Sequence, residues 1–140
     1  MGQFLSRYTD LALTLLRIVA GLLFMQHGMQ KLFGLLGGFM GTPGATAPLF
    51  SLLGLAGILE FFGGLAILVG VFTQPVAFVL AGEMAVAYFV AHAPRGLWPA
   101  QNQGELAVLY TFVFLFLATA GGGRFSLDSV LFQKSADSRL

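Results

Sequence analysis

Four long apolar stretches constrain what this chain can fold into. They cover residues 11–33, 49–72, 76–93 and 104–120, approximately. A helix needs about 20 apolar residues to cross a hydrocarbon core about 30 Å thick. The first two stretches reach this length by themselves. The third and fourth are shorter, even when the polar ends His92, Gly104 and Glu105 are counted with them. Membrane-spanning strands are a poor alternative, because the stretches are long and lack alternation of apolar and polar residues.

The composition excludes several classes of protein. Only 9% of the residues are charged and 57% are hydrophobic, whereas soluble domains have about 25% charged residues. The net charge is +1 without a basic block, so a nucleic acid is not an expected partner. The chain has no cysteine, which excludes disulfides, Fe–S clusters and thiolate metal sites. Redox chemistry would therefore belong to a bound cofactor or a partner.

These features predict an all-α integral membrane protein with four transmembrane helices in a compact bundle. The bundle would occupy residues 11–132, between an N-terminal cytoplasmic segment of residues 1–10 and a polar tail of residues 133–140. Basic residues are enriched on the cytoplasmic side of membrane proteins. Four spans place Arg7, Arg124, Lys134 and Arg139 on one side, and Lys31 and Arg95 on the other. Both termini are therefore expected in the cytoplasm.

Ionisable residues inside the apolar stretches are the candidate functional residues. They are Arg17, His27, Lys31, Glu60, Glu83 and His92. Because a charge in lipid costs ~2.5–3.5 kcal/mol, these side chains should face the bundle interior and pair. The helical rise of 1.5 Å per residue places Arg17 level with Glu83 and Glu60 near the midplane. We therefore expect Arg17 to pair with one of these acids.

Both structural and functional interpretations of these residues stay open. Arg17 and its acid could be a structural ion pair, or part of a site in which an unpaired midplane carboxyl relays protons. His27 and His92 could lie at the membrane–water interface with their hydrogen bonds satisfied there, or they could bind a quinone or a haem. Lys31 could extend to the headgroups.

The helical phase adds a constraint on the third span. Glu83 and His92 are nine residues apart, which places them on opposite faces of a straight helix. They can share a pocket only if the helix ends or bends before Pro94. The residues that follow, Asn102 and Glu105, have the spacing of a capping box. We therefore expect Asn102 to cap the fourth helix and Glu105 to be a cap rather than a ligand.

Glycines accompany the charged residues at helical spacing. Gly21 and Gly28 share a face with Arg17 and Lys31, and Gly57 and Gly64 flank Glu60. Such glycines allow helix backbones to approach closely in membranes. No metal site is predicted, because no His-x-x-x-His or Glu-x-x-His pair occurs. A haem b held by His27 and His92 has little support, and no catalytic or nucleotide-binding motif occurs.

Three sequence blocks resemble the DoxX family. They are LRIVAGLLF with HGMQKLFG (residues 16–24 and 27–34), GILEFFGGL (residues 57–65) and GRFSLD (residues 123–128). The family implies a four-helix protein of the bacterial inner membrane, related to the DoxD subunit of thiosulfate:quinone oxidoreductase. By resemblance, the motif positions are Arg17, Gly21, Gly28, Lys31, Glu60, Gly64 and Asp128. The family assigns no catalytic role to any of them.

The resemblance and the buried charges together suggest a membrane subunit associated with an oxidoreductase system. It would bind a quinone-like apolar ligand between helices. Glu60 would relay protons, Arg17 would set the pKa of Glu60, and His27 would form a hydrogen bond with the ring. One alternative is a non-enzymatic scaffold for a soluble partner enzyme. Another is a small-molecule permease, which would need a homo-oligomer. Whether the chain is catalytic stays open, because it has no self-sufficient catalytic motif.

Overall fold

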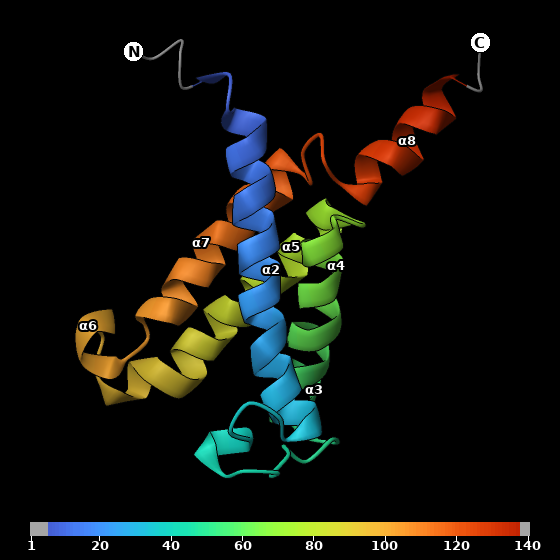
Figure 1. Ribbon diagram of the computed structural model, residues 1–140. Coiled ribbons are helices and arrows are strands. Elements are labelled where there is room, and N and C mark those ends of the chain that lie inside the picture. Colours follow the sequence, from blue (N-terminus) through green and yellow to red (C-terminus); the bar gives the residue numbers. More distant parts are fainter. Residues whose placement is uncertain (1–5, 138–140) are drawn as a thin grey trace.

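The computed structural model describes the backbone of residues 6–137 and the side chains of residues 6–132. Every regular element in this part of the chain is helical (Figure 1), which confirms the all-α class. The start of the predicted segment 1–10 lies outside the described residues. So do residues 138–140 and the side chains of the predicted tail, including Lys134 and Arg139.

Helices occupy the four apolar stretches. The first is α2 (Thr9–Phe33), and the second consists of α3 (Leu52–Ile58), a π-helical turn η2 (Leu59–Gly63) and α4 (Gly64–Val69). The third consists of α5 (Thr73–Ala87), a π-helical turn η3 (Tyr88–His92) and a 3-10 turn η4 (Ala93–Arg95), and the fourth is α7 (Glu105–Ala120). The short elements are η1 (Phe39–Gly41), α6 (Pro99–Asn102) and the terminal α8 (Leu127–Asp137).

Three of these helical segments are long and apolar enough to cross a membrane, namely Thr9–Phe33, Leu52–Val69 and Thr73–Arg95. The fourth, α7, has 16 residues, which gives a length of about 24 Å at the α-helical rise. It is apolar but shorter than a complete span. The crossing of α7 is therefore part of the proposal below.

The helices are arranged as two pairs. One pair is α2 with the α3–η2–α4 segment, and the other is α5 with α7. The pairs meet near the end where α8 begins and diverge toward the end that carries α3 and α6 (Figure 1). Where they meet, Phe24, Ile67, Leu80, Phe114 and Leu117 form a core with at most 1% exposure. The arrangement is more open than the compact bundle expected from the sequence.

Glycines set the close packing of the first pair. A Cβ atom on Gly21 would lie 2.5 Å from the backbone nitrogen of Leu68, and one on Gly28 would lie 2.4 Å from that of Phe61. On the facing helix, a Cβ atom on Gly64 would lie 2.7 Å from the backbone nitrogen of Met25, and one on Gly57 would lie 2.9 Å from Cβ of Lys31. The backbones therefore approach at a distance that only glycine permits.

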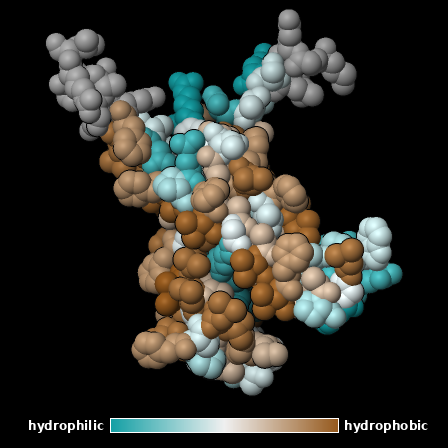
Figure 2. All heavy atoms as spheres, turned by 180° about the vertical axis from the view of Figure 1, so that it is seen from behind, coloured by the Kyte–Doolittle hydropathy of each residue, from teal (hydrophilic) through white to brown (hydrophobic). Residues whose placement is uncertain are grey.

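The outer surface of the helices is apolar. Large hydrophobic side chains such as Leu15, Val19, Leu55, Phe78 and Phe112 are exposed. Seen from behind, brown side chains cover much of the middle and lower part of the visible face, and hydrophilic atoms gather at the top and on the part that projects to the right (Figure 2). A few hydrophilic atoms are also visible among the brown side chains (Figure 2). This surface is suited to contact with lipid tails rather than water.

Candidate functional site

Arg17 does not pair with an acid, which corrects the expectation from the sequence. Its guanidinium donates to the backbone oxygens of Ile67, Leu68, Gly122 and Phe125. Ile67 and Leu68 lie in the last turn of α4, where carbonyl groups have no partner within the helix. The side chain is 2% exposed. Arg17 therefore satisfies the C-terminal carbonyls of α4 and ties them to the segment after α7.

Asp128 completes this junction from the other side. Its carboxylate accepts from the backbone nitrogens of Phe72 at 2.7 Å and Thr73 at 2.8 Å, so it caps the N-terminus of α5. It is also the acidic group whose charge acts on Arg17. We call Arg17, Asp128 and the backbone groups that they bind the latch. The latch fixes the end at which the two helix pairs meet.

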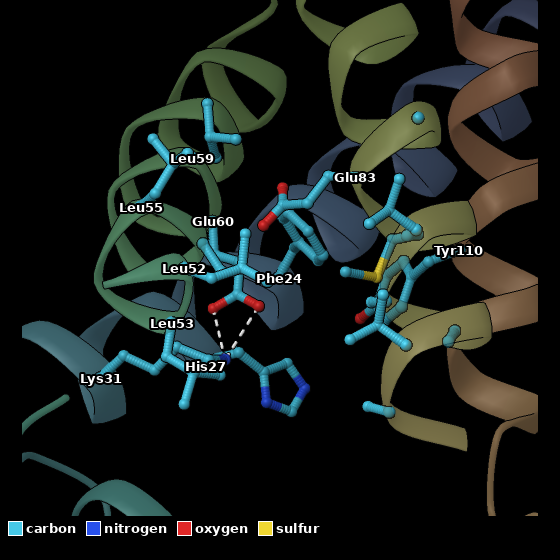
Figure 3. Close-up of a pocket in the computed structure, with 18 of the residues that line it drawn as sticks. Phe24, His27, Lys31, Leu52, Leu53, Leu55, Leu59, Glu60, Glu83 and Tyr110 are labelled. Atoms are coloured by element: carbon cyan, nitrogen blue, oxygen red, sulfur yellow. Dashed lines mark hydrogen bonds and ion pairs between the residues drawn. The ribbon is translucent and has the colours of Figure 1, made fainter. Parts of the chain in front are cut away.

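A cavity of about 580 Å³ lies between the two pairs. Its walls come from α2, from the α3–η2 segment, from α5 with η3, and from the start of α7, and Figure 3 shows many of the side chains. Most of these side chains are apolar. The large exposed hydrophobic residues among them are Leu52, Leu53, Leu55, Val79, Val86, Val90 and Leu106. The cavity therefore has apolar flanks that face outward.

Lys31 and Glu60 form an ion pair in this cavity. Lys31 Nζ lies 2.6 Å and 2.9 Å from the two carboxylate oxygens of Glu60, so one ammonium bridges both oxygens (Figure 3). The two side chains are 17% and 6% exposed. Lys31 therefore compensates a buried acid from the neighbouring helix.

Glu83 faces the same cavity without a hydrogen-bond partner. Both of its carboxyl oxygens are buried, and neither has a donor among the described residues. The charged groups that act on it are Glu60 and Lys31, and its carboxyl group lies on the Glu60 side of the cavity in Figure 3. A buried polar group without a partner is costly. The carboxyl group of Glu83 therefore has unused hydrogen-bonding capacity inside the cavity.

His92 also lines the cavity, nine residues after Glu83. The π-helical turn η3 explains how both reach one space, because each residue of a π-turn rotates less than in an α-helix. His92 Nδ1 lies 3.1 Å from the backbone oxygen of Asn102 and 3.2 Å from a guanidinium nitrogen of Arg95. His92 is thus anchored in the loop at the margin of the cavity.

The remaining wall includes one predicted residue and two that sequence reasoning missed. The predicted residue is His27, which is half-buried and lies one helical turn before Lys31. Tyr110 was missed, although its hydroxyl group makes it one of the few polar residues in the apolar stretch of α7, and its ring centroid lies 5.2 Å from that of Phe24. Gly82 was also missed, because a single glycine beside Glu83 gives no pattern of its own.

Asn102 and Glu105 do not form the expected capping box. Gly104 is the N-cap of α7, because Gln103 adopts a left-handed conformation (φ 60°) that delays the start of the helix. Asn102 is buried, accepts from the Gly104 nitrogen at 2.8 Å, and donates to Gly96 and Tyr88. Glu105 is exposed in the first turn. Asn102 therefore organises the loop rather than the helix end alone.

The cavity combines a large apolar surface with a few polar groups on one side. Such a composition is typical of sites for small apolar molecules with a polar end. Among the side chains of residues 6–132, no group of three or more His, Asp or Glu is placed to hold a metal ion. The chemistry available is hydrogen bonding and proton exchange at Glu83, Glu60, His27 and Lys31.

Comparison with known proteins identifies the family. The sequence model described as DoxX matches residues 12–93. The chain belongs to the DoxX family. This match confirms the resemblance seen in the sequence, and it includes the helices that carry Lys31, Glu60 and Glu83.

Two relatives of this DoxX protein extend the similarity over nearly the whole chain. An uncharacterized protein of Haemophilus influenzae is 38% identical over 133 residues, which cover 93% of this chain and 98% of the relative. The inner membrane protein YqjF of Escherichia coli is 32% identical over 139 residues, with 93% and 99% covered. No solved structure matches. With its apolar helices, this DoxX protein is a multi-pass inner membrane protein in contact with the lipid bilayer.

Proposed function

We propose that this DoxX protein binds a quinone-like apolar molecule in the cavity between its helix pairs, as the membrane subunit of an oxidoreductase system. The observation that carries the proposal is the buried, unpartnered carboxyl group of Glu83 in an otherwise apolar cavity of about 580 Å³. A quinone has the matching chemistry: an apolar ring with oxygen atoms that accept hydrogen bonds and take up protons on reduction. Electrons would come from a partner protein.

Each polar residue has a distinct part in this proposal. Glu83 would exchange a hydrogen bond and a proton with a ring oxygen, because its oxygens have no other partner among the described residues. Glu60, held by Lys31, would keep a fixed charge close to Glu83. His27 would face a second polar atom of the ligand. Arg17 has no direct part, because it is committed to the latch.

The same proposal includes four spans with both termini in the cytoplasm. The start of α2 and the helix α8 lie at one end of the molecule (Figure 1). Arg7 and Arg124 belong to this end, whereas Lys31 and Arg95 belong to the opposite end. The bias of Arg and Lys toward the cytoplasm supports this orientation. The cavity would then lie in the outer half of the membrane.

The test is to identify what the protein carries when it is extracted mildly from its own membranes. Native mass spectrometry of the wild type should detect a bound quinone mass. The variants Glu83→Leu and His27→Ala should lose most of it, because each removes a polar group from the cavity. Glu105→Leu is the matched control, since Glu105 is an exposed acid outside the cavity. A wild-type protein that neither carries a quinone nor binds added quinone would refute the proposal.

A second candidate function is that of a scaffold for a soluble enzyme. It is favoured by α8, which extends away from the helix pairs (Figure 1) and exposes Leu127, Val130 and Phe132. Packing within the described chain does not account for these apolar side chains. Truncation after Ser129 keeps Asp128 in the latch. If it released a co-purifying enzyme without changing quinone content, the scaffold function would reside in α8.

A further inference from the structure

Gly82 differs from the other glycines in the long helices. The glycines in the long helices are Gly21, Gly28, Gly54, Gly57, Gly63, Gly64 and Gly82. At the first six, an added Cβ would lie within 3 Å of a neighbouring atom, whereas at Gly82 it would meet nothing within 4 Å. Close packing therefore explains six of these glycines and leaves Gly82 unexplained.

A glycine without a packing role is unfavourable in the middle of a helix. It has more backbone freedom to lose on folding than alanine, and it contributes no side chain to bury. Gly82 also has no left-handed backbone that would require glycine, because it lies inside α5. The empty volume beside its Cα atom is therefore the property that distinguishes it.

That empty volume belongs to the cavity. Gly82 lines it, directly before Glu83 in the chain. Val79 and Val86 also line it and are exposed, and their spacing of three and four residues places them on the same face of α5. The face therefore has bare backbone at Gly82 between two valine side chains. This shape fits a flat ring better than a branched or bulky group.

We propose that Gly82 is the specificity-determining contact for the ring of the bound ligand. The ring lies on the α5 backbone at Gly82, between Val79 and Val86, with a ring oxygen directed to Glu83. This inference rests on the proposed quinone-binding function and specifies where the ring is held. It also explains why the side chain is absent at this position and not elsewhere on the same face.

The test is a series of side chains of increasing size at Gly82, with decylubiquinone as the probe and the full-length protein in nanodiscs. Gly82→Ala should change the dissociation constant by no more than about threefold, whereas Gly82→Leu and Gly82→Phe should weaken binding about tenfold or more. The melting temperature should stay equal or rise, because each replacement is a better helix former and its Cβ atom meets no other atom within 4 Å. Phe78→Ala is the control, since Phe78 is exposed on α5 outside the cavity.

A second measurement uses the absence of cysteine from the chain. In Gly82→Cys, the only thiol would lie at the proposed ring contact, and N-ethylmaleimide alkylates it at a measurable rate. Decylubiquinone at ten times its dissociation constant should slow this reaction about tenfold. This small replacement keeps the inference testable if the Leu and Phe variants fail to fold.

The outcomes separate the two proposals. If the wild type binds decylubiquinone but Gly82→Leu and Gly82→Phe bind it within twofold of the wild type, the assignment of Gly82 is wrong and the proposed function stands. Unprotected alkylation of Gly82→Cys at saturating quinone leads to the same conclusion. If the wild type does not bind the quinone, the proposed function fails, and the ring contact fails with it.

Discussion

The ion pair between Lys31 and Glu60 allows a quantitative test of how this protein holds charge inside the membrane. Replacing Lys31 by methionine keeps an unbranched side chain and removes the ammonium group. Glu60, which is 6% exposed, would then have lost the cation that bridges both of its oxygens. Removing one partner of a buried pair costs about 3–5 kcal/mol. We expect the free energy of unfolding of Lys31→Met to fall by about this amount.

Replacing the acid of the pair should lower the free energy of unfolding by less than replacing the lysine. In Glu60→Gln the amide keeps one acceptor for Lys31, and Lys31 is 17% exposed, so its long side chain can extend toward the headgroups. We expect a loss of about 1–3 kcal/mol. The double variant removes both charges, so its loss should be smaller than the sum of the two single losses. The coupling energy should be about 1–3 kcal/mol, within the range known for residues in contact.

The assay is reversible unfolding by sodium dodecyl sulfate in mixed micelles, followed by far-UV circular dichroism. Glu105→Gln serves as the control, because it neutralises an exposed acid at the start of α7. If the sum of the two single losses equals the loss of the double variant to within about 0.5 kcal/mol, Lys31 and Glu60 do not stabilise one another. The proposal of a fixed charge beside Glu83 would then be refuted.

Three further predictions concern the latch, the helix interface and the loop. Arg17→Lys should lower the free energy of unfolding by about 2–4 kcal/mol in thermal denaturation, because an ammonium cannot reproduce the planar fork that reaches four carbonyls. Gly28→Ala should cost about 1–3 kcal/mol in the same assay, because its Cβ would lie 2.4 Å from the Phe61 nitrogen. Asn102→Ala should remove the shorter of the two hydrogen bonds of the Gly104 amide and leave the Pro99 oxygen at 3.2 Å, and faster hydrogen exchange at Gly104 would detect this.

The helices and their closest contacts follow from local patterns in the sequence. The apolar stretches are long, and glycine or proline separates them, so the helices lie where hydropathy indicates. The glycines near Arg17 and Glu60 recur at helical spacing, and the structure places Gly21, Gly28 and Gly64 where the first two spans meet. Both features depend on residues close together in the chain.

The partner of Arg17 was beyond this reasoning for a physical reason. Depth along straight helices compares side-chain charges alone, so it suggested an acid. Backbone carbonyls at the end of α4 carry partial negative charge and lack helical partners, and they lie closer to the guanidinium. Charge pairing from the sequence therefore fails wherever a helix end competes with a carboxylate.

The sequence left the shared cavity of Glu83 and His92 conditional on an end or bend in the third helix, and it did not locate that irregularity. A π-turn at Tyr88–His92 changes the phase of the third helical segment, and another at Leu59–Gly63 includes Glu60. Such turns result from packing between helices and have no reliable sequence signal. They are frequent at functional sites, and here both lie in the walls of one cavity.

The charged residues that carry the DoxX resemblance divide into two groups with different physical consequences. Arg17 and Asp128 bind backbone groups, and their bonds hold together the end at which the helix pairs meet. Lys31 and Glu60 bind each other, where the pairs diverge around the cavity. Because the latch and the core hold one end, the other end can leave space between helices without separating them. The closed end therefore permits the open one, and the chain maintains a largely apolar cavity with buried polar groups that a uniformly packed bundle would fill.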